Sequence, residues 1–108
     1  MATVYRGRHT TLDRDVAIKV LHPHLSRSPR NRSRFAREAR AIEHLEHDNI
    51  LRIFDYSGKD ADDCYIVTEF VDGATLQALV QEQGRLPGEV VTLIALRLTA
   101  ALGYAHDL

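Results

Sequence analysis

The sequence predicts an α+β fold in which an antiparallel sheet is followed by helices. Residues 16–21 (Val-Ala-Ile-Lys-Val-Leu) form a β-branched run that is typical of a strand. Residues 32–46 place apolar side chains three and four positions apart, which is the period of an amphipathic helix. Along the 108 residues, the predicted order is strand, strand, helix, strand, strand and two helices.

The first half of the chain alternates short apolar runs with polar connections. Residues 2–8 are predicted to form a strand, residues 10–15 a polar turn and residues 16–21 the second strand. A connector that contains proline and serine spans residues 22–31. The helix that follows carries one apolar stripe, made of Phe35, Ala39, Ile42 and Leu45.

Two more strands and two helices are predicted in the second half. Residues 50–56 and 64–70 are strands joined by a polar turn, so we expect them to pair as a hairpin. A short helix at residues 75–83 follows a turn marked by Asp-Gly. A final helix covers residues 89–107.

The last helix is apolar around most of its circumference. Such a helix is normally buried on all sides, and a four-stranded sheet crossed by one helix cannot cover it. The sequence therefore predicts a covering partner, which is either another chain or more of this one. The apolar positions are Val90, Val91, Leu93, Ile94, Ala95, Leu96, Leu98, Ala100, Ala101 and Leu102.

Composition excludes several classes of protein. Hydrophobic residues make up 44% and charged residues 27%, as in ordinary globular proteins, which argues against disorder. The sequence has no uninterrupted run of about 18 apolar residues and no apolar segment at its start, so neither a transmembrane segment nor a signal peptide is expected. The single cysteine, Cys64, fits a reducing, cytoplasmic setting. A net charge of −1 gives no overall attraction to nucleic acid or lipid.

Two charged residues occupy positions that are otherwise apolar. Lys19 lies inside the second strand and shares a face with Ala17. Glu38 lies on the apolar stripe of the long helix. Each charge is costly to desolvate alone, so we expect the two to form an ion pair at low dielectric. The alternative is that both are half-exposed surface charges.

Histidines and arginines offer weaker candidates. His22 with His24, and His44 with His47, lack the cysteine or carboxylate cluster that would complete a metal site, so no metal is expected. An arginine-rich stretch could contact nucleic acid or a phosphorylated protein. We favour a solvated helix face, because no aromatic residues interleave with the arginines and the net charge is negative. The stretch comprises Arg27, Arg30, Arg32, Arg34, Arg37 and Arg40.

Several short motifs follow one another in a fixed order. They are Met-Ala-Thr-Val-Tyr-Arg-Gly-Arg at residues 1–8, Val-Ala-Ile-Lys at 16–19, Arg-Glu-Ala at 37–39, His-Asp-Asn-Ile-Leu at 47–51, the segment 65–76 and Leu-Gly-Tyr-Ala-His at 102–106. Val-Ala-Ile-Lys is the strand motif of protein kinases. In this order the motifs resemble the N-terminal lobe of bacterial-type (eukaryotic-like, Hanks-type) serine/threonine protein kinases.

The resemblance implies two parts. Residues 1–71 would be a kinase N-lobe with a truncated glycine-rich loop, an antiparallel sheet that lacks its first strand, and helix αC. Residues 72–108 would be the hinge exit and the first helices of the C-lobe, αD and αE. The missing C-lobe would pack on residues 89–107. The His-Arg-Asp and Asp-Phe-Gly motifs, which supply the catalytic base and the magnesium ligands, are not in the chain.

The resemblance also implies roles for individual residues. Lys19 and Glu38 would be the catalytic pair: Lys19 holds the α- and β-phosphates of ATP, and Glu38 holds Lys19 extended. Thr68 would be the gatekeeper behind the adenine. The other nucleotide-binding residues would be Val4 and Ala17 above the adenine, the backbones of Glu69 and Val71 at its edge, and Asp72 and Thr75 near the ribose.

The implied function is that of a fragment of an ATP-dependent serine/threonine protein kinase. Its cofactors would be ATP and, in the complete protein, Mg²⁺; its partners would be a protein substrate and the missing C-lobe, with no nucleic acid and no membrane segment in this chain. The kinase domain would be cytoplasmic, in a parent that can be membrane-anchored. The fragment alone is expected to be inactive. The alternative is a non-catalytic pseudokinase or a truncated interaction module.

Overall fold

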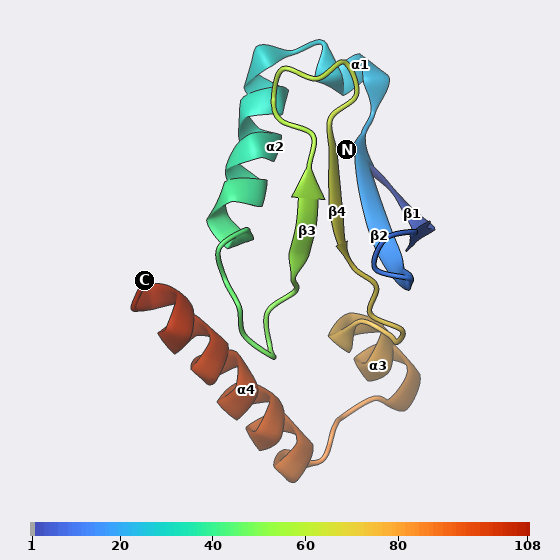
Figure 1. Ribbon diagram of the computed structural model, residues 1–108. Helices are drawn as coiled ribbons and strands as arrows, with labels where there is room; N and C mark the ends of the chain where they lie inside the picture. The colour runs from blue at the N-terminus through green and yellow to red at the C-terminus, as the bar shows by residue number, and fades with distance from the viewer. Residues whose placement is uncertain (1) are drawn as a thin grey trace. The chain divides into compact units, whose positions relative to one another are not determined.

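A computed structural model describes residues 2–108 (Figure 1). The chain divides into two compact units. The first contains the described residues up to Glu46 together with Leu51–Phe70, and the second contains His47–Ile50 and Val71–Leu108.

The first unit is built on a four-stranded antiparallel sheet. Its strands are β1 (Ala2–His9), β2 (Arg14–Leu21), β4 (Tyr65–Glu69) and β3 (Ile53–Tyr56), in that spatial order. The predicted hairpin of the last two strands is confirmed, with an irregularity between Ile53 and Asp55. Strand β4, from the second half of the chain, therefore pairs with β2, and β1 and β3 are the two edge strands of the sheet.

Strand β3 begins three residues later than the sequence suggested. The Glu69 side chain explains the difference, because its Oε1 accepts a hydrogen bond from the Arg52 amide at 2.9 Å. The Glu69 amide in turn donates to the Arg52 carbonyl at 3.0 Å. The Glu69 carboxylate thus takes the place of a backbone carbonyl as acceptor for the Arg52 amide. Regular strand structure in β3 therefore starts at Ile53.

The long helix is shifted towards the N-terminus relative to the prediction of 32–46. Helix α2 spans Pro29–Ile42, and Leu45, the last residue of the predicted stripe, lies beyond it. Proline fits the first helical position because its fixed φ suits the helix and its missing N–H is not needed there. The connector contains a one-turn helix, α1 (Pro23–Ser26), which also begins at a proline.

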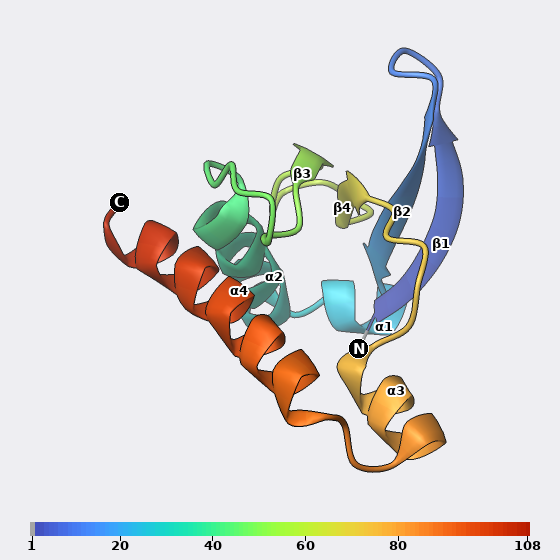
Figure 2. The same cartoon turned by 90° about the horizontal axis from the view of Figure 1, so that it is seen from below.

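Helix α2 packs on one face of the sheet and forms the core with it (Figures 1 and 2). Phe35 and Cys64 are both fully buried. Cys64 directly precedes β4, which begins one residue later than the strand predicted for residues 64–70. The Phe35 and Tyr56 rings lie 6.5 Å apart. Burial, followed by the neighbouring Cys64, raises the pKa of the Tyr56 phenol. The buried core cluster comprises Leu21, Phe35, Ala39, Cys64 and Ile66.

The second unit consists of α3 (Leu76–Gln83), α4 (Gly88–His106) and the segment 47–50. The Asn49 side chain donates to the Arg97 carbonyl at 3.2 Å, and the His47 and Tyr104 rings lie 5.2 Å apart. These contacts attach the segment 47–50 to the middle and the end of α4.

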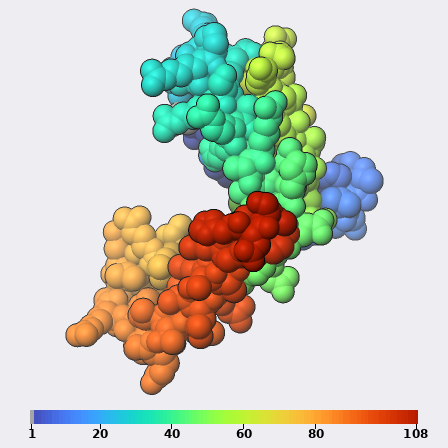
Figure 3. All heavy atoms as spheres, turned by 90° about the vertical axis from the view of Figure 1, so that its left-hand side faces the viewer, coloured from blue at the N-terminus to red at the C-terminus, as the bar shows by residue number. Residues whose placement is uncertain are grey.

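Most apolar side chains of α4 are exposed. Ala101 is the one buried residue of this helix, whereas Leu96 is 63% exposed. In Figure 3 the side chains of α4, coloured orange to red, lie open along the helix. By its length and overall composition, α4 is long and apolar enough to cross a membrane, even though polar residues interrupt its apolar sequence. The core helix of a soluble protein passes the same test. The described chain therefore does not supply the cover that the sequence predicts for this helix.

Candidate functional site

The structure brings Lys19 and Glu38 together. Lys19 lies in the middle of β2 and Glu38 on α2, and Lys19 Nζ donates to Glu38 Oε1 at 2.6 Å. Lys19 Nζ also lies 5.9 Å from the centre of the Phe35 ring, which is buried under the same helix. Packing of α2 on the sheet therefore determines where the ammonium group is held.

The expectation that this pair is desolvated is wrong. The side chains of Lys19 and Glu38 are 34% and 48% exposed. Their exposure therefore fits the alternative expectation, in which both are half-exposed surface charges. The core cluster of α2 and the sheet ends beside the pair and leaves both charged ends open to solvent. The ammonium group is thus fixed in position and still accessible to a ligand.

Because the pair is half exposed, we expect it to contribute little to stability. Exposed ion pairs typically contribute between 0 and about 1 kcal/mol. Lys19→Met should therefore change the free energy of unfolding by less than about 1 kcal/mol, as measured by urea denaturation. Glu38→Gln is the matched variant and should behave alike. A loss of about 3 kcal/mol or more, the cost of breaking a buried pair, would contradict an open site.

Strand register places other predicted residues on the same face of the sheet as Lys19. Val4 lies directly opposite Lys19 on β1, and Thr68 lies directly opposite Ala17 on β4. Directly opposed residues share a face, as do alternate residues of one strand. Val4 is 63% exposed and Thr68 is 9% exposed. This face therefore offers an open apolar side chain, a small residue and a fixed cation.

Hydrogen bonds hold the end of β4. The Thr68 hydroxyl donates to the Glu69 carbonyl at 3.0 Å, and the Glu69 amide and side chain are both engaged with the Arg52 backbone. A carbonyl oxygen has two lone pairs, so the Glu69 carbonyl can accept a second donor.

The remaining predicted residues belong to the second unit. Val71 is 67% exposed, and Asp72 is exposed. Thr75 is the N-cap of α3, where its side-chain oxygen accepts a hydrogen bond from the Ala78 amide at 3.1 Å. The structure thus gives Thr75 a capping role that is independent of any ligand.

Arg6 is a residue of this face that sequence reasoning missed. Its guanidinium lies 4.2 Å from the centre of the Phe70 ring, and its Nη2 donates to Asp15 Oδ2 at 2.5 Å. This bond, and next the bond from Arg8, lower the pKa of the Asp15 carboxyl. The signal was present in the alternation of the first strand, because Arg6 lies two residues after Val4.

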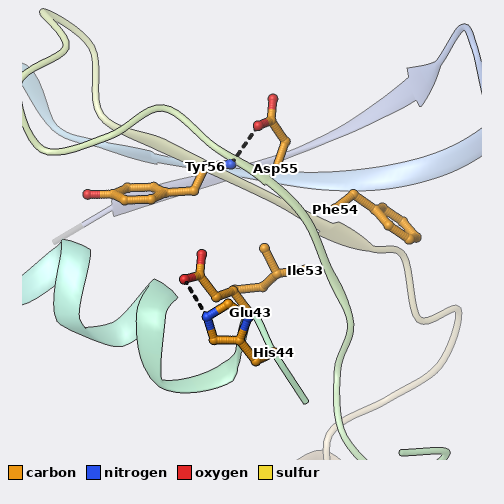
Figure 4. A pocket seen from close by; sticks show the side chains of 6 residues that line it. All are labelled: Glu43, His44, Ile53, Phe54, Asp55 and Tyr56. Atoms are coloured by element: carbon orange, nitrogen blue, oxygen red, sulfur yellow. Dashed lines mark hydrogen bonds and ion pairs between the residues drawn. The ribbon is translucent and has the colours of Figure 1, made fainter. Parts of the chain in front are cut away.

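A separate hollow of about 340 Å³ lies between the end of α2 and β3, and Figure 4 shows that the rings of Tyr56 and Phe54 extend in different directions around it. Its polar groups already interact locally: Glu43 is 3.2 Å from His44, and Asp55 accepts from the Tyr56 amide at 2.8 Å. No group of three or more metal-ligating side chains occurs among residues 2–108. The lining residues are Glu43, His44, Ile53, Phe54, Asp55 and Tyr56.

Comparison with known proteins identifies the family. The family model described as protein kinase domain matches residues 1–108. The chain is 39% identical over 115 residues to the serine/threonine-protein kinase PksC of Streptomyces coelicolor and 37% identical over 107 residues to PrkC of Bacillus subtilis. These matches cover 100% and 99% of this chain, but 21% and 16% of those proteins.

Solved structures give the same result. The kinase domain of Mycobacterium tuberculosis PknI superimposes with a TM-score of 0.79 and 31% identity, over 99% of this chain and 43% of that one. Rad53 in complex with AMP-PNP superimposes with a TM-score of 0.76 and 26% identity, over 98% of this chain and 27% of that one. The described sheet and helices are therefore those of an N-lobe and the first helices after it, and the chain belongs to the protein kinase family, among relatives that are bacterial serine/threonine kinases.

Proposed function

We propose that this chain is part of an ATP-dependent serine/threonine protein kinase and that Lys19, held by Glu38, binds the α- and β-phosphates of ATP. The observation that carries the proposal is the 2.6 Å contact between two half-exposed charges on a buried framework. A pair that adds little stability and yet fixes an accessible cation is suited to bind a polyanion.

The residues around the pair fit a nucleotide. Val4 and Ala17 lie on the same face of the sheet as Lys19. Val4 presents an exposed apolar side chain to a flat base, and the small side chain of Ala17 leaves room for it. Thr68 lies buried opposite Ala17, which suits a gatekeeper. The family resemblance adds the backbones of Glu69 and Val71 at the adenine edge, and Asp72 and Thr75 near the ribose. Rad53, a structural relative, was solved with AMP-PNP.

ATP with Mg²⁺ supplies the transferable phosphoryl group when bound. The residues of this chain would bind and orient the nucleotide, and the catalytic base and the magnesium ligands would come from the remaining kinase domain. We further propose that the C-lobe, which is the remaining part of the kinase domain, covers α4. The substrate would be a protein hydroxyl, and the kinase domain would work in the cytoplasm. The alternative is a non-catalytic module that retains the pair of Lys19 and Glu38 but lacks the His-Arg-Asp and Asp-Phe-Gly motifs. The coding sequence beyond residue 108 distinguishes the kinase from the non-catalytic module.

Titration of the chain with a fluorescent ATP analogue tests the proposed site. Lys19→Met should weaken binding by at least about tenfold, because a hydrogen bond to a charged group is worth about 1.5–3 kcal/mol. Lys59→Met is the matched control, since Lys59 is the other lysine of the chain and lies exposed in the β3–β4 connection. Equal affinity of both variants, with each one folded by circular dichroism, would contradict the proposal.

A further inference from the structure

Arg6 reaches from the edge strand β1 across the sheet to the residue that follows β4. It lies directly opposite Ala17, and Ala17 lies directly opposite Thr68, so the three residues form one row across β1, β2 and β4 (Figure 1). Phe70 lies two residues after Thr68, just beyond the end of β4 at Glu69. The Arg6 guanidinium is 4.2 Å from the centre of the Phe70 ring. A side chain of β1 thus contacts the chain at the point where it leaves the sheet.

A carboxylate orients the guanidinium of Arg6. Arg6 Nη2 donates to Asp15 Oδ2 at 2.5 Å, and Arg8 Nη1 donates to the other oxygen, Oδ1, at 3.1 Å. Arg8 lies directly opposite Asp15 and alternates with Arg6, so all three residues share one face of the sheet. The bond from Arg6, and next the bond from Arg8, keep the pKa of Asp15 below its usual value, so this carboxylate stays charged at neutral pH. Arg6 is therefore held between a carboxylate and an aromatic ring.

The contact between Arg6 and Phe70 acts locally. The face of an aromatic ring attracts a cation, and arginine is the cation most often found there. The Arg6 side chain is 60% exposed and Phe70 is only partly buried, so the contact adds little to the stability of the fold. Its main effect is to restrict where the Phe70 ring, and with it the backbone on either side, can lie.

The residue before Phe70 is anchored from the other side of β4. The Glu69 amide donates to the Arg52 carbonyl at 3.0 Å, and Glu69 Oε1 accepts from the Arg52 amide at 2.9 Å. Strand β3 lies on one side of β4, whereas Arg6 comes from β1 on the other side, across β2. Two consecutive residues are thus fixed from opposite directions, Glu69 by β3 and Phe70 by β1.

We propose that Arg6, oriented by Asp15 and stacked on Phe70, is a positioning residue for the base of the bound nucleotide. The proposal rests on the function proposed above, in which the backbones of Glu69 and Val71 bind the adenine edge. Phe70 lies between these two residues in the sequence, so a ring that is held in place limits the freedom of both backbone groups. Arg6 acts through Phe70 and not by contact with the nucleotide. Its loss should weaken recognition of adenine and leave recognition of the phosphates unchanged.

Isothermal titration calorimetry of the full chain with adenosine, ATP and inorganic tripolyphosphate separates these two kinds of recognition. Arg6→Met should weaken binding of adenosine and ATP by about two- to fivefold, as expected for an exposed cation–π contact, and leave binding of tripolyphosphate unchanged. Phe70→Leu should have the same effect, whereas Phe70→Tyr keeps the ring and should bind like the wild type. The double variant Arg6→Met with Phe70→Leu should lose no more than either single variant, because both remove the same contact.

Arg14→Met is the matched control. It removes the same charge from an arginine that lies 5.0 Å over another ring, that of Phe54, and it lies on the other face of the sheet because it alternates with Asp15. The control should bind all three ligands like the wild type. Equal losses in Arg6→Met and the control would overturn the proposal, as would a loss of tripolyphosphate binding that matches the loss of adenosine binding. Unchanged adenosine binding by Arg6→Met would overturn it too.

The same titrations test the underlying nucleotide site separately. Lys19→Met should weaken binding of tripolyphosphate and ATP and spare adenosine, which is the reverse of the pattern expected for Arg6→Met. If Lys19→Met gives its pattern and Arg6→Met does not, only the role of Arg6 is wrong. A wild-type chain that binds none of the three ligands would overturn the proposed function and the role of Arg6 together.

Discussion

Replacing Phe35 by alanine is expected to lower the free energy of unfolding of the first unit by about 3–5 kcal/mol. Phe35 is fully buried and lies in the same cluster as Leu21 and Ile66. Its loss removes apolar contact area and leaves a cavity between α2 and the sheet. Ala39, the next buried residue on that side of the helix, is too small to fill this cavity.

The expected loss is a large part of the total stability of a small domain, which is typically about 5–15 kcal/mol. Urea denaturation followed by circular dichroism measures it. Phe54→Ala is the matched control, because Phe54 is only partly buried and lies outside the core cluster. The control should lose less than half as much. Equal losses in the two variants would show that α2 is not anchored through Phe35.

Lys19 also depends on this packing. Its ammonium group is held by Glu38, and Glu38 is held in place because α2 is fixed to the sheet through Phe35 and Ala39. A substitution that loosens α2 but leaves the first unit folded should therefore break the contact between Lys19 and Glu38 before it disrupts the strands.

Sequence patterns predicted the order of the elements because strand and helix periods differ. The β-branched run at residues 16–21 and the apolar stripe of α2 were each sufficient to identify their element. The pairing of Lys19 with Glu38 also followed from the sequence, since each charge interrupts an apolar pattern. These are local properties that a single segment displays.

Other features depend on distant parts of the chain and could not be predicted in this way. The start of β3 depends on the Glu69 side chain, which reaches Arg52 across the sheet. The exposure of Lys19 and Glu38 depends on where the cover of the sheet ends, and no periodicity reports this. The start of α2 at Pro29 was missed because the apolar stripe begins six residues later, at Phe35.

Incubated with Mg²⁺, ATP and a protein substrate, the 108-residue chain by itself is expected to transfer no γ-phosphate above background. Phosphoryl transfer requires that ATP, metal and acceptor hydroxyl are all positioned. The chain contains neither His-Arg-Asp nor Asp-Phe-Gly, and residues 2–108 contain no metal-ligating group of three side chains. In the function proposed above, the chain would therefore supply only a part of the nucleotide site.

Radiolabelled ATP and a mixture of unphosphorylated proteins provide the measurement, with the fluorescent nucleotide titration run in parallel. Nucleotide binding without transfer is the expected pair of results, since binding requires Lys19 and its surroundings, whereas transfer also requires the metal and the base. Lys19→Met separates a genuine signal from contamination. Transfer of phosphate that this variant abolishes would show that the chain holds a complete catalytic site, and the roles proposed for the C-lobe would then be wrong.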